Sequence, residues 1–231
     1  MNYIIWNNKD SRNIKGLLIC ELPPITKPQM RAKETVIDGV DGSTIEELGY
    51  ESYDKTIAIG LRAGADIDDI TEYFMGNGNI IFSNEPNKYY IATIIKGIDY
   101  SRLLQYRVAK VTFRVQPFKY DNTEIEIYNS GNSKEMTVVN IGNYIAKPVI
   151  TIKGTGTIYL SVNGNTLCQY TFPEGDDTVI LDSVKQDAYY GEALKNRTML
   201  GDFPTLAKGT NIISWSGTVE RISIRQYSRW L

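Results

Sequence analysis

The chain has 231 residues and a formal charge of −2 at pH 7, with 42% hydrophobic and 23% charged residues. This composition is typical of a soluble globular protein, and the length is sufficient for one large unit or two smaller ones. The near-neutral charge gives no electrostatic basis for binding a phosphate backbone, so nucleic acid is not expected as a partner.

The sequence contains no histidine. This absence excludes Ser-His-Asp and Cys-His catalytic groups and histidine-based zinc sites, because histidine supplies their general base or their ligand. Cys20 and Cys168 lie far apart in the sequence, and we expect both to be buried, reduced thiols. We expect no cofactor, no metal and no enzymatic activity.

The chain also lacks the signals that direct proteins into or across membranes. Residues 1–7 contain no positive leader followed by an apolar stretch, and no apolar run reaches the roughly 18 residues that a membrane helix needs. Membrane insertion is therefore not expected, and the protein is expected to stay in the compartment where it is made.

The first part of the chain is predicted to form short strands. Residues 16–22 and 31–37 are the first two candidates, and the three prolines of residues 23–28 place a loop or a sheet edge between them. A proline cannot donate a hydrogen bond to a neighbouring strand. The intervening segment is therefore excluded from the interior of a sheet.

Residues 38–43 are expected to reverse the chain. Gly39 and Gly42 tolerate positive φ angles, and Asp41 can hydrogen-bond its own backbone, as turns require. A strand over residues 56–62 follows, because its aliphatic side chains alternate with a period of two.

A helix near residues 66–76, of about three turns, is the one helix that the sequence predicts. Asp66 is a suitable N-cap, Asp69 can reach back as in a capping box, and Gly76 is expected to end the helix. The acids of this segment are an alternative cation site, since hard ions prefer several oxygen ligands. Capping and the helix dipole explain the same acids without a ligand, and we favour that interpretation.

Two further strands are expected over residues 89–95 and 107–115, the second with an alternating apolar face. Pro117 is expected to end this part of the chain. The sequence thus predicts a first domain over residues 1–119 that is mostly β with one helix.

The second domain is predicted over residues 120–231. A hairpin is expected across residues 123–138 with a polar tip at residues 129–133. A second hairpin is predicted at Asn163 and Gly164, because Asn-Gly suits a type I′ turn with positive φ at both central positions.

Later strands are expected over residues 178–182, 211–216 and 219–226. Gly209 is assigned to the turn before the second of these strands, and Gly217 to the last reversal of the chain. Short strands joined by tight turns are typical of a β-sandwich.

Two pairs of acids in the second domain are candidates for the catalytic carboxylates of a glycosidase. Glu124 and Glu126 share the polar face of an exposed strand, whereas Asp176 and Asp177 lie in a turn. Solvated surface is the better explanation of both pairs.

Three aromatic residues are candidates for contact with a glycan or a partner protein: Tyr189, Tyr190 and Trp230. Exposed aromatic rings stack on sugar rings and are enriched in interface cores. Packing within the fold remains the alternative for all three. Trp215 shares strand parity with Ile213 and is expected in the core.

The order and spacing of these elements resemble the distal tail (Dit) proteins of long-tailed, non-contractile bacteriophages. In the first half, the resemblance rests on the turn of residues 39–42, the strand over residues 57–61, the single short helix and the paired late strands. In the second half, it rests on the following segments: Asn140-Ile141-Gly142, residues 148–154, Gly156, Asn163-Gly164, residues 179–182, residues 201–206, residues 209–213, Gly217, residues 222–224 and Arg229-Trp230.

The resemblance implies a mainly β protein of two domains. The first would be a β-sandwich-like domain with one short α-helix, six copies of which form a ring. The second would be a galectin-like or carbohydrate-module-like β-sandwich that projects from the ring.

Such a protein would be a structural hub at the virion tail tip, made in the cytoplasm of the bacterial host. It would join the tail tube protein to the tail-associated and receptor-binding proteins through assembly alone, with no chemical step. The alternative is a carbohydrate-binding module that mediates attachment to the host cell surface.

Overall fold

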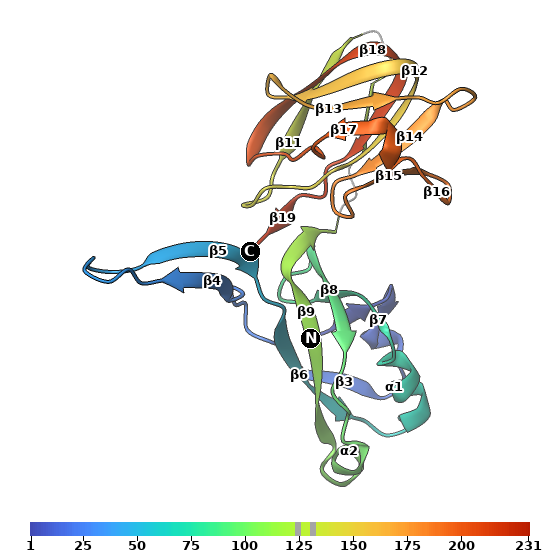
Figure 1. The fold of residues 1–231 in the computed structure, drawn as a ribbon. Coiled ribbons are helices and arrows are strands. Elements are labelled where there is room, and N and C mark those ends of the chain that lie inside the picture. The colour runs from blue at the N-terminus through green and yellow to red at the C-terminus, as the bar shows by residue number, and fades with distance from the viewer. Residues whose placement is uncertain (123–125, 130–132) are drawn as a thin grey trace. The chain divides into compact units, whose positions relative to one another are not determined.

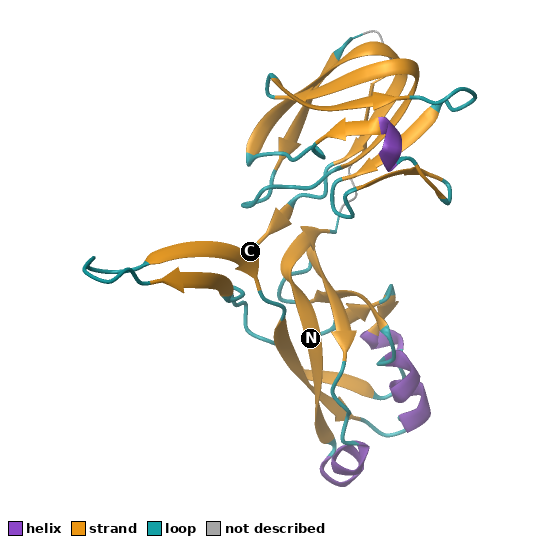
Figure 2. Ribbon diagram, in the orientation of Figure 1, coloured by secondary structure: helices purple, strands orange, loops and turns teal. Residues whose placement is uncertain are grey.

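The computed structural model describes residues 1–122, 126–129 and 133–231. The chain divides into two compact units, one of residues 1–122 together with Leu231 and one of residues 123–230. Strands make up most of both units (Figures 1 and 2), which confirms the mainly β fold. In the described part of the chain, no helix is long and apolar enough to cross a membrane.

The first unit is built on one antiparallel sheet and a separate two-stranded ribbon. In the sheet the strands follow the order β2-β1-β7-β8-β9-β6-β3, whereas β4 and β5 form the ribbon. The bounds of these strands are β1 (Ile4–Trp6), β2 (Lys9–Asp10), β3 (Leu17–Glu21), β4 (Met30–Thr35), β5 (Thr44–Tyr50), β6 (Tyr53–Leu61), β7 (Asn77–Phe82), β8 (Lys88–Ile94) and β9 (Val108–Asp121).

One face of this sheet forms the core of the first unit. Ile57 and Ile59 of β6 and Val111 and Phe113 of β9 are fully buried, in the alternation predicted from the sequence. The helix α1 (Ile67–Tyr73) supplies Ile70 and Tyr73 to the same hydrophobic cluster. The apolar stripe of α1 therefore covers this face of the sheet.

The helix α1 is shorter than predicted. It spans seven residues, and Phe74 occupies its C-cap position, two residues before Gly76 with φ of 85°. Asp66 is the N-cap residue, and its side chain accepts a hydrogen bond of 2.9 Å from the backbone N–H of Asp68. In the described structure Asp69 makes no reciprocal bond to the N-cap, so the cap is a single Asp66 bond.

A second helix, α2 (Tyr100–Tyr106), lies where the sequence predicted no element. Leu103 is fully buried, whereas Leu104 and Tyr106 are exposed. Among the helix residues whose burial is described, Leu103 alone is fully buried, which gives no amphipathic stripe and explains why the pattern was missed. Arg107, with φ of 59°, follows the helix directly.

Pro117 does not end the first unit, because β9 continues through it to Asp121. The ladder between β8 and β9 shifts register between Tyr90 and Ala92, which pair with Lys119 and Val115. Pro117 thus lies within a bulge of β9, where its missing N–H removes no regular ladder bond. The strand therefore passes the point at which the sequence predicted a boundary.

The second unit contains strands in the order β10-β18-β12-β14-β15-β16, with β11 paired to β18 and β13 paired to both β12 and β17. A 3-10 turn, η2 (Asn196–Thr198), precedes β17. The strand bounds are β10 (Glu126–Asn129), β11 (Glu135–Asn140), β12 (Val149–Val162), β13 (Asn165–Thr171), β14 (Thr178–Asp182), β15 (Asp187–Tyr190), β16 (Ala193–Leu194), β17 (Met199–Gly201), β18 (Gly209–Arg225) and β19 (Arg229–Trp230).

Two long, bent strands build both layers of the second unit. The first half of β12 pairs with β14 and its second half pairs with β13, while β18 follows β12 along both halves. Buried residues from both halves, including Ile152, Leu160, Trp215 and Ile224, belong to one hydrophobic cluster. The sandwich therefore arises because β12 and β18 bend from one layer into the other.

Two sequence predictions for this unit are wrong. Gly217 is not at a reversal, because β18 runs unbroken from Gly209 to Arg225 and bends there instead. Strands β10 and β11 do not form the predicted hairpin, since each pairs with a different part of β18. Residues 123–125 and 130–132, which include Glu124 and part of the predicted tip, lie outside the described residues.

The cysteines also differ from expectation. Both are free thiols, but Cys20 is exposed and only Cys168 is buried. Burial raises the pKa of the Cys168 thiol to about 11, so this thiol stays protonated and inert at neutral pH.

The bend leaves no room for a side chain at Gly217, so adding one methyl group there is expected to lower the stability of the fold strongly. A Cβ atom at Gly217 would lie 2.4 Å from the Thr157 carbonyl oxygen, and the residue has φ of 94°. Gly217→Ala is expected to lower the free energy of unfolding by about 3 kcal/mol, through overpacking and strain combined. Urea denaturation followed by near-ultraviolet circular dichroism measures this change.

Gly164→Ala is the matched control, because Gly164 has φ of 83° but no atom within 4 Å of the added Cβ. It should cost only about 1–2 kcal/mol, the strain of a left-handed alanine. Equal losses in the two variants would contradict the close approach at the bend.

Candidate functional site

The three aromatic candidates from the sequence do not form one platform. Tyr189 and Tyr190 are consecutive on β15 and therefore point to opposite sides of the strand. The Lys185 Nζ atom lies 5.2 Å from the centre of the Tyr189 ring, and Tyr190 is 52% exposed. Trp230 lies on β19 and is partly buried.

The predicted turn residues lie at loops or bends of the backbone. Asn163 and Gly164 have φ of 53° and 83° between β12 and β13. The Asn163 side chain also accepts a hydrogen bond of 2.8 Å from the Ile212 N–H and donates one of 3.0 Å to the buried Asn211. Gly209, with φ of 88°, begins β18.

The turn at Gly39, Asp41 and Gly42 joins two paired strands, of which the sequence predicted only the first. Strands β4 and β5 and this turn form a two-stranded arm of residues 30–50, drawn in Figure 1 as a ribbon separate from the sheet. The positive φ angles of both glycines, 82° and 86°, allow the reversal. Strand β5 is the part that was missed.

Side chains along the arm are almost all exposed, including large apolar ones. Val36 and Val40 at the turn are 69% and 61% exposed, and Ile45 of β5 is 60% exposed. The arm also contains five acids and two bases, so its net charge is −3: Glu34, Asp38, Asp41, Glu46 and Glu47 against Arg31 and Lys33. The arm is thus an acidic surface with exposed apolar side chains.

The chain that leads into the arm is tied to the sheet through backbone oxygens. Lys55 of β6 donates a hydrogen bond of 3.0 Å to the Pro24 oxygen, and Asn84 donates one of 3.0 Å to the Pro23 oxygen. At the base of β5, the ring of Tyr50 lies edge-on to Phe118 at 6.0 Å. These contacts fix where the arm leaves the sheet.

Lys55 is buried, and three aromatic rings surround its ammonium group. The Nζ atom lies 4.9 Å from the ring centre of Tyr90, 5.6 Å from that of Tyr53 and 5.7 Å from that of Phe82. Burial lowers the pKa of Lys55 to about 8, against a smaller opposing effect of the nearby Glu85 carboxylate. The strand pattern alone gave no sign of this site, since Lys55 occupies an inward position of β6.

Glu85 connects the residues around Lys55. It accepts a hydrogen bond of 2.5 Å from the Tyr90 hydroxyl and forms an ion pair with Lys119. The Tyr90 hydroxyl therefore faces a carboxylate, and burial raises the pKa of this hydroxyl above its usual range. Three elements of the first unit are joined by this network.

The face of the first sheet opposite α1 is uncovered within the first unit. We call it the open face, and its residues alternate with the buried ones on β6, β8 and β9. Its members with charged or large apolar side chains are Asp54, Ile91, Val108, Lys110 and Arg114.

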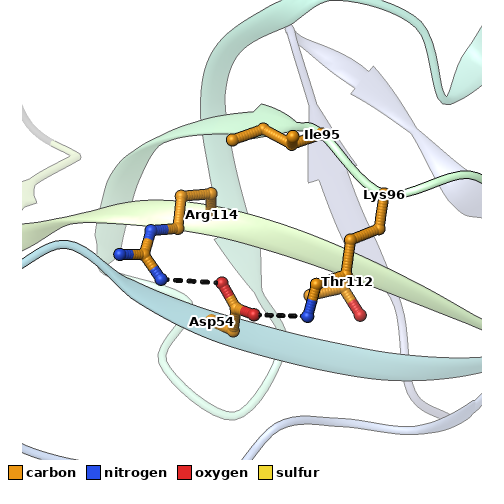
Figure 3. A pocket seen from close by; sticks show the side chains of 5 residues that line it. All are labelled: Asp54, Ile95, Lys96, Thr112 and Arg114. Atoms are coloured by element: carbon orange, nitrogen blue, oxygen red, sulfur yellow. Dashed lines mark hydrogen bonds and ion pairs between the residues drawn. The ribbon is translucent and has the colours of Figure 1, made fainter.

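A shallow cavity of about 200 Å³ lies on the open face (Figure 3) and is lined by Asp54, Ile95, Lys96, Thr112 and Arg114. The Asp54 carboxylate accepts hydrogen bonds of 2.7 Å from Lys96 and 3.1 Å from Arg114. These bonds, that of Lys96 above all, hold the pKa of Asp54 below its usual value. The single acid is thus paired with two cations.

Lys110 is the cation of the open face that has no ion-pair partner among the described residues. It is exposed and lies directly opposite Ala58 on β6, so no bulky side chain shields it there. Exposed Val108 and Ile91 lie on the same face. The open face is therefore basic and partly apolar, the complement of the arm in charge.

The acids near α1 do not gather into a metal site. Within residues 1–122, 126–129 and 133–231, no three acidic or cysteine side chains lie close enough together to hold an ion. The Asp66 side chain instead caps α1.

The buried Lys55 predicts a pH dependence of stability with a defined sign. Between pH 8 and 10.5 the unfolded chain retains the lysine proton that the folded protein has lost. The free energy of unfolding of the wild-type protein should therefore rise relative to Lys55→Met, by about 1 kcal/mol per pH unit in this window.

Urea denaturation of both proteins from pH 7 to 10 measures this difference. Below pH 8 both states hold the proton, and the difference should be constant. Tyr53 and Tyr90, whose rings lie beside Lys55, do not ionise in this range, because burial raises the pKa of Tyr53 to about 12 and that of Tyr90 above its usual range. A difference that does not change between pH 8 and 10 would contradict a buried lysine with a lowered pKa.

Comparison with known proteins supports the fold through structure rather than sequence. No protein-family model and no curated protein matches the chain. Among solved structures, the SPP1 Dit (gp 19.1) protein, described as a paradigm of the hub adsorption apparatus of phages that infect Gram-positive bacteria, is similar over 100% of both chains, with a TM-score of 0.68 and 14% identity.

A weaker likeness, with a TM-score of 0.45 and 10% identity, covers 98% of this chain and 98% of a chain of the phage p2 baseplate in its activated conformation. The first likeness extends over both units and includes the mainly β architecture described above. The mainly β fold expected from the sequence is thereby confirmed, and it is similar to the fold of the SPP1 Dit protein over the whole chain.

Proposed function

We propose that this chain is a structural hub protein of a phage tail tip, which assembles through contacts between its own copies. The observation that carries the proposal is the exposed, acidic arm of residues 30–50 on a unit whose sheet has an open, basic face. The fold, similar to that of the SPP1 Dit protein, supports the same interpretation.

The arm has the properties of a segment that becomes ordered against a partner. A two-stranded ribbon without a covered face is only marginally stable in water. Its outer edges present unpaired backbone groups, which are suited to pairing with another chain. Its exposed apolar residues, such as Val36 and Ile45, would gain stability from burial at an interface.

A second copy of the chain is the partner that the charges favour. The arm has a net charge of −3. On the open face, the acid Asp54 is already paired with two cations, and Lys110 has no ion-pair partner among the described residues. Because arm and open face are different surfaces, their contact is heterologous. Repeated contacts of this kind close into a ring when the rotation between copies permits.

We infer a ring of six copies, as the resemblance to distal tail proteins implies. In this role the ring would join the tail tube protein to the tail-associated and receptor-binding proteins at the virion tail tip. The mechanism is positional, and it requires no catalytic step.

A charge exchange between the two surfaces tests this proposal. Lys110→Glu places an acid on the open face opposite the acidic arm, so it should weaken self-association at least tenfold, about 1.4 kcal/mol per contact. Adding Glu46→Lys and Glu47→Lys on the arm should restore association, since attraction is re-established with reversed signs. Light scattering over a concentration series gives the mass of the assembly.

Lys208→Glu is the control, because it makes the same change of charge at an exposed position of the second unit. Its assembly should match the wild type. Self-association that is unaffected by Lys110→Glu, or a double arm variant that does not rescue it, would contradict the proposed contact.

A further inference from the structure

The second unit contains a polar groove on the outer surface of one of its layers. The groove has a volume of about 270 Å³ and crosses strands β10, β12, β14 and β18. Its lining residues are Glu126, Thr151, Lys153, Thr178, Arg221 and Ser223. None of the aromatic candidates from the sequence is among them.

The pleat of β12 and β18 explains why these side chains share one surface. Ile152 and Ile222 point into the core, so their neighbours along each strand point outward. Thr151 pairs directly with Ser223, and Lys153 pairs with Arg221. The centre of the groove is thus a floor of small hydroxyl side chains, with two cations at one end.

These two cations are an unusual pair. Like charges directly opposite each other on neighbouring strands destabilise a sheet. Lys153 is partly neutralised, because its Nζ atom lies 2.9 Å from Glu220 and 3.8 Å from Asp177. In the described part of the protein, no carboxylate lies within ion-pair distance of Arg221, whose guanidinium instead lies 4.8 Å from the ring centre of Tyr128.

An acid lines another part of the groove. Glu126 accepts a hydrogen bond of 3.1 Å from the Tyr128 hydroxyl and lies 3.6 Å from Arg225. The Ser223 hydroxyl, by hydrogen bonding, holds the pKa of Glu126 below its usual value. The groove therefore offers a charged acceptor, hydroxyl groups and a guanidinium that has no carboxylate partner among the described residues.

Aromatic rings flank this floor on both sides. The register places Tyr128 of β10 opposite Ser223, and Ser223 opposite Thr151. On the other side Thr151 pairs with Ile180, which pairs with Tyr189. Tyrosine rings that combine an apolar face with a polar edge suit ligands that do the same, as sugar rings do.

We propose that this groove binds a saccharide that carries a carboxylate or phosphate group. The anionic group would lie between Arg221 and Lys153, since a guanidinium binds such groups through two parallel hydrogen bonds. Sugar hydroxyls would contact Thr151, Ser223 and Glu126, with the ring against Tyr128. The volume of the groove is slightly below that of typical ligand pockets, about 300–1,000 Å³, and it suits a single monosaccharide ring.

Titration of the full-length protein with small probes tests this assignment. The probes are glucuronic acid and glucose 6-phosphate, compared with glucose and with inorganic phosphate, and the readout is the chemical shift of backbone amides. The two acidic sugars should bind with perturbations centred on the groove, and glucose at least tenfold more weakly.

Arg221→Gln should weaken the binding of both acidic sugars about tenfold, whereas Arg221→Lys should weaken it less because the charge is kept. Arg197→Gln removes the same charge from an exposed residue of η2 and should bind like the wild type. Both changes are on the surface, and the amide spectrum of each variant reports whether the fold is intact.

Three outcomes would overturn the proposal. The first is binding of glucose as strong as that of the acidic sugars, which would remove the role of the cations. The second is binding of inorganic phosphate as strong as that of glucose 6-phosphate, which would leave an anion site without sugar recognition. The third is no perturbation of the groove by either acidic sugar. The proposal does not depend on ring assembly, so each can fail separately.

Discussion

Within the first unit, helix and core cover only one face of the described sheet, and most features of this unit depend on that constraint. The helix α1 packs on the face that holds Ile57, Ile59 and Phe113. The opposite face keeps Val108 and Lys110 exposed, and the arm forms a sheet of its own. A unit with an uncovered face and an exposed ribbon is suited to burying both against further copies.

In the second unit, strands rather than a helix cover the hydrophobic core. Because β12 and β18 bend together near Gly156 and Gly217, one pair of strands supplies side chains to both layers of a closed core. Every inward position is thereby covered by the unit itself. What remains for contact with other molecules is the polar outer surface, where the groove with Arg221 lies.

The sequence predicted features that depend on neighbours in the chain and missed those that depend on distant pairing. Alternation identified β6 and β9, and Asp66 caps α1 through its own first turn. The sequence predicted a domain boundary at Pro117 and a reversal at Gly217, yet both residues lie within strands. Pro117 is accommodated by a bulge in β9, and Gly217 by a bend that β18 shares with β12. The charged sites were missed for the same reason, since residues far apart in sequence enclose Lys55 and Arg221.

The central claim is the contact between the arm of one copy and the open face of the next. Disulfide formation between Ile45→Cys in one chain and Val108→Cys in another tests it directly, with Cys20→Ser in both because Cys20 is exposed. The account predicts linked pairs of the two chains when they are mixed. Little linkage in that mixture, or as much linkage when Val108→Cys is replaced by Lys208→Cys, would contradict it.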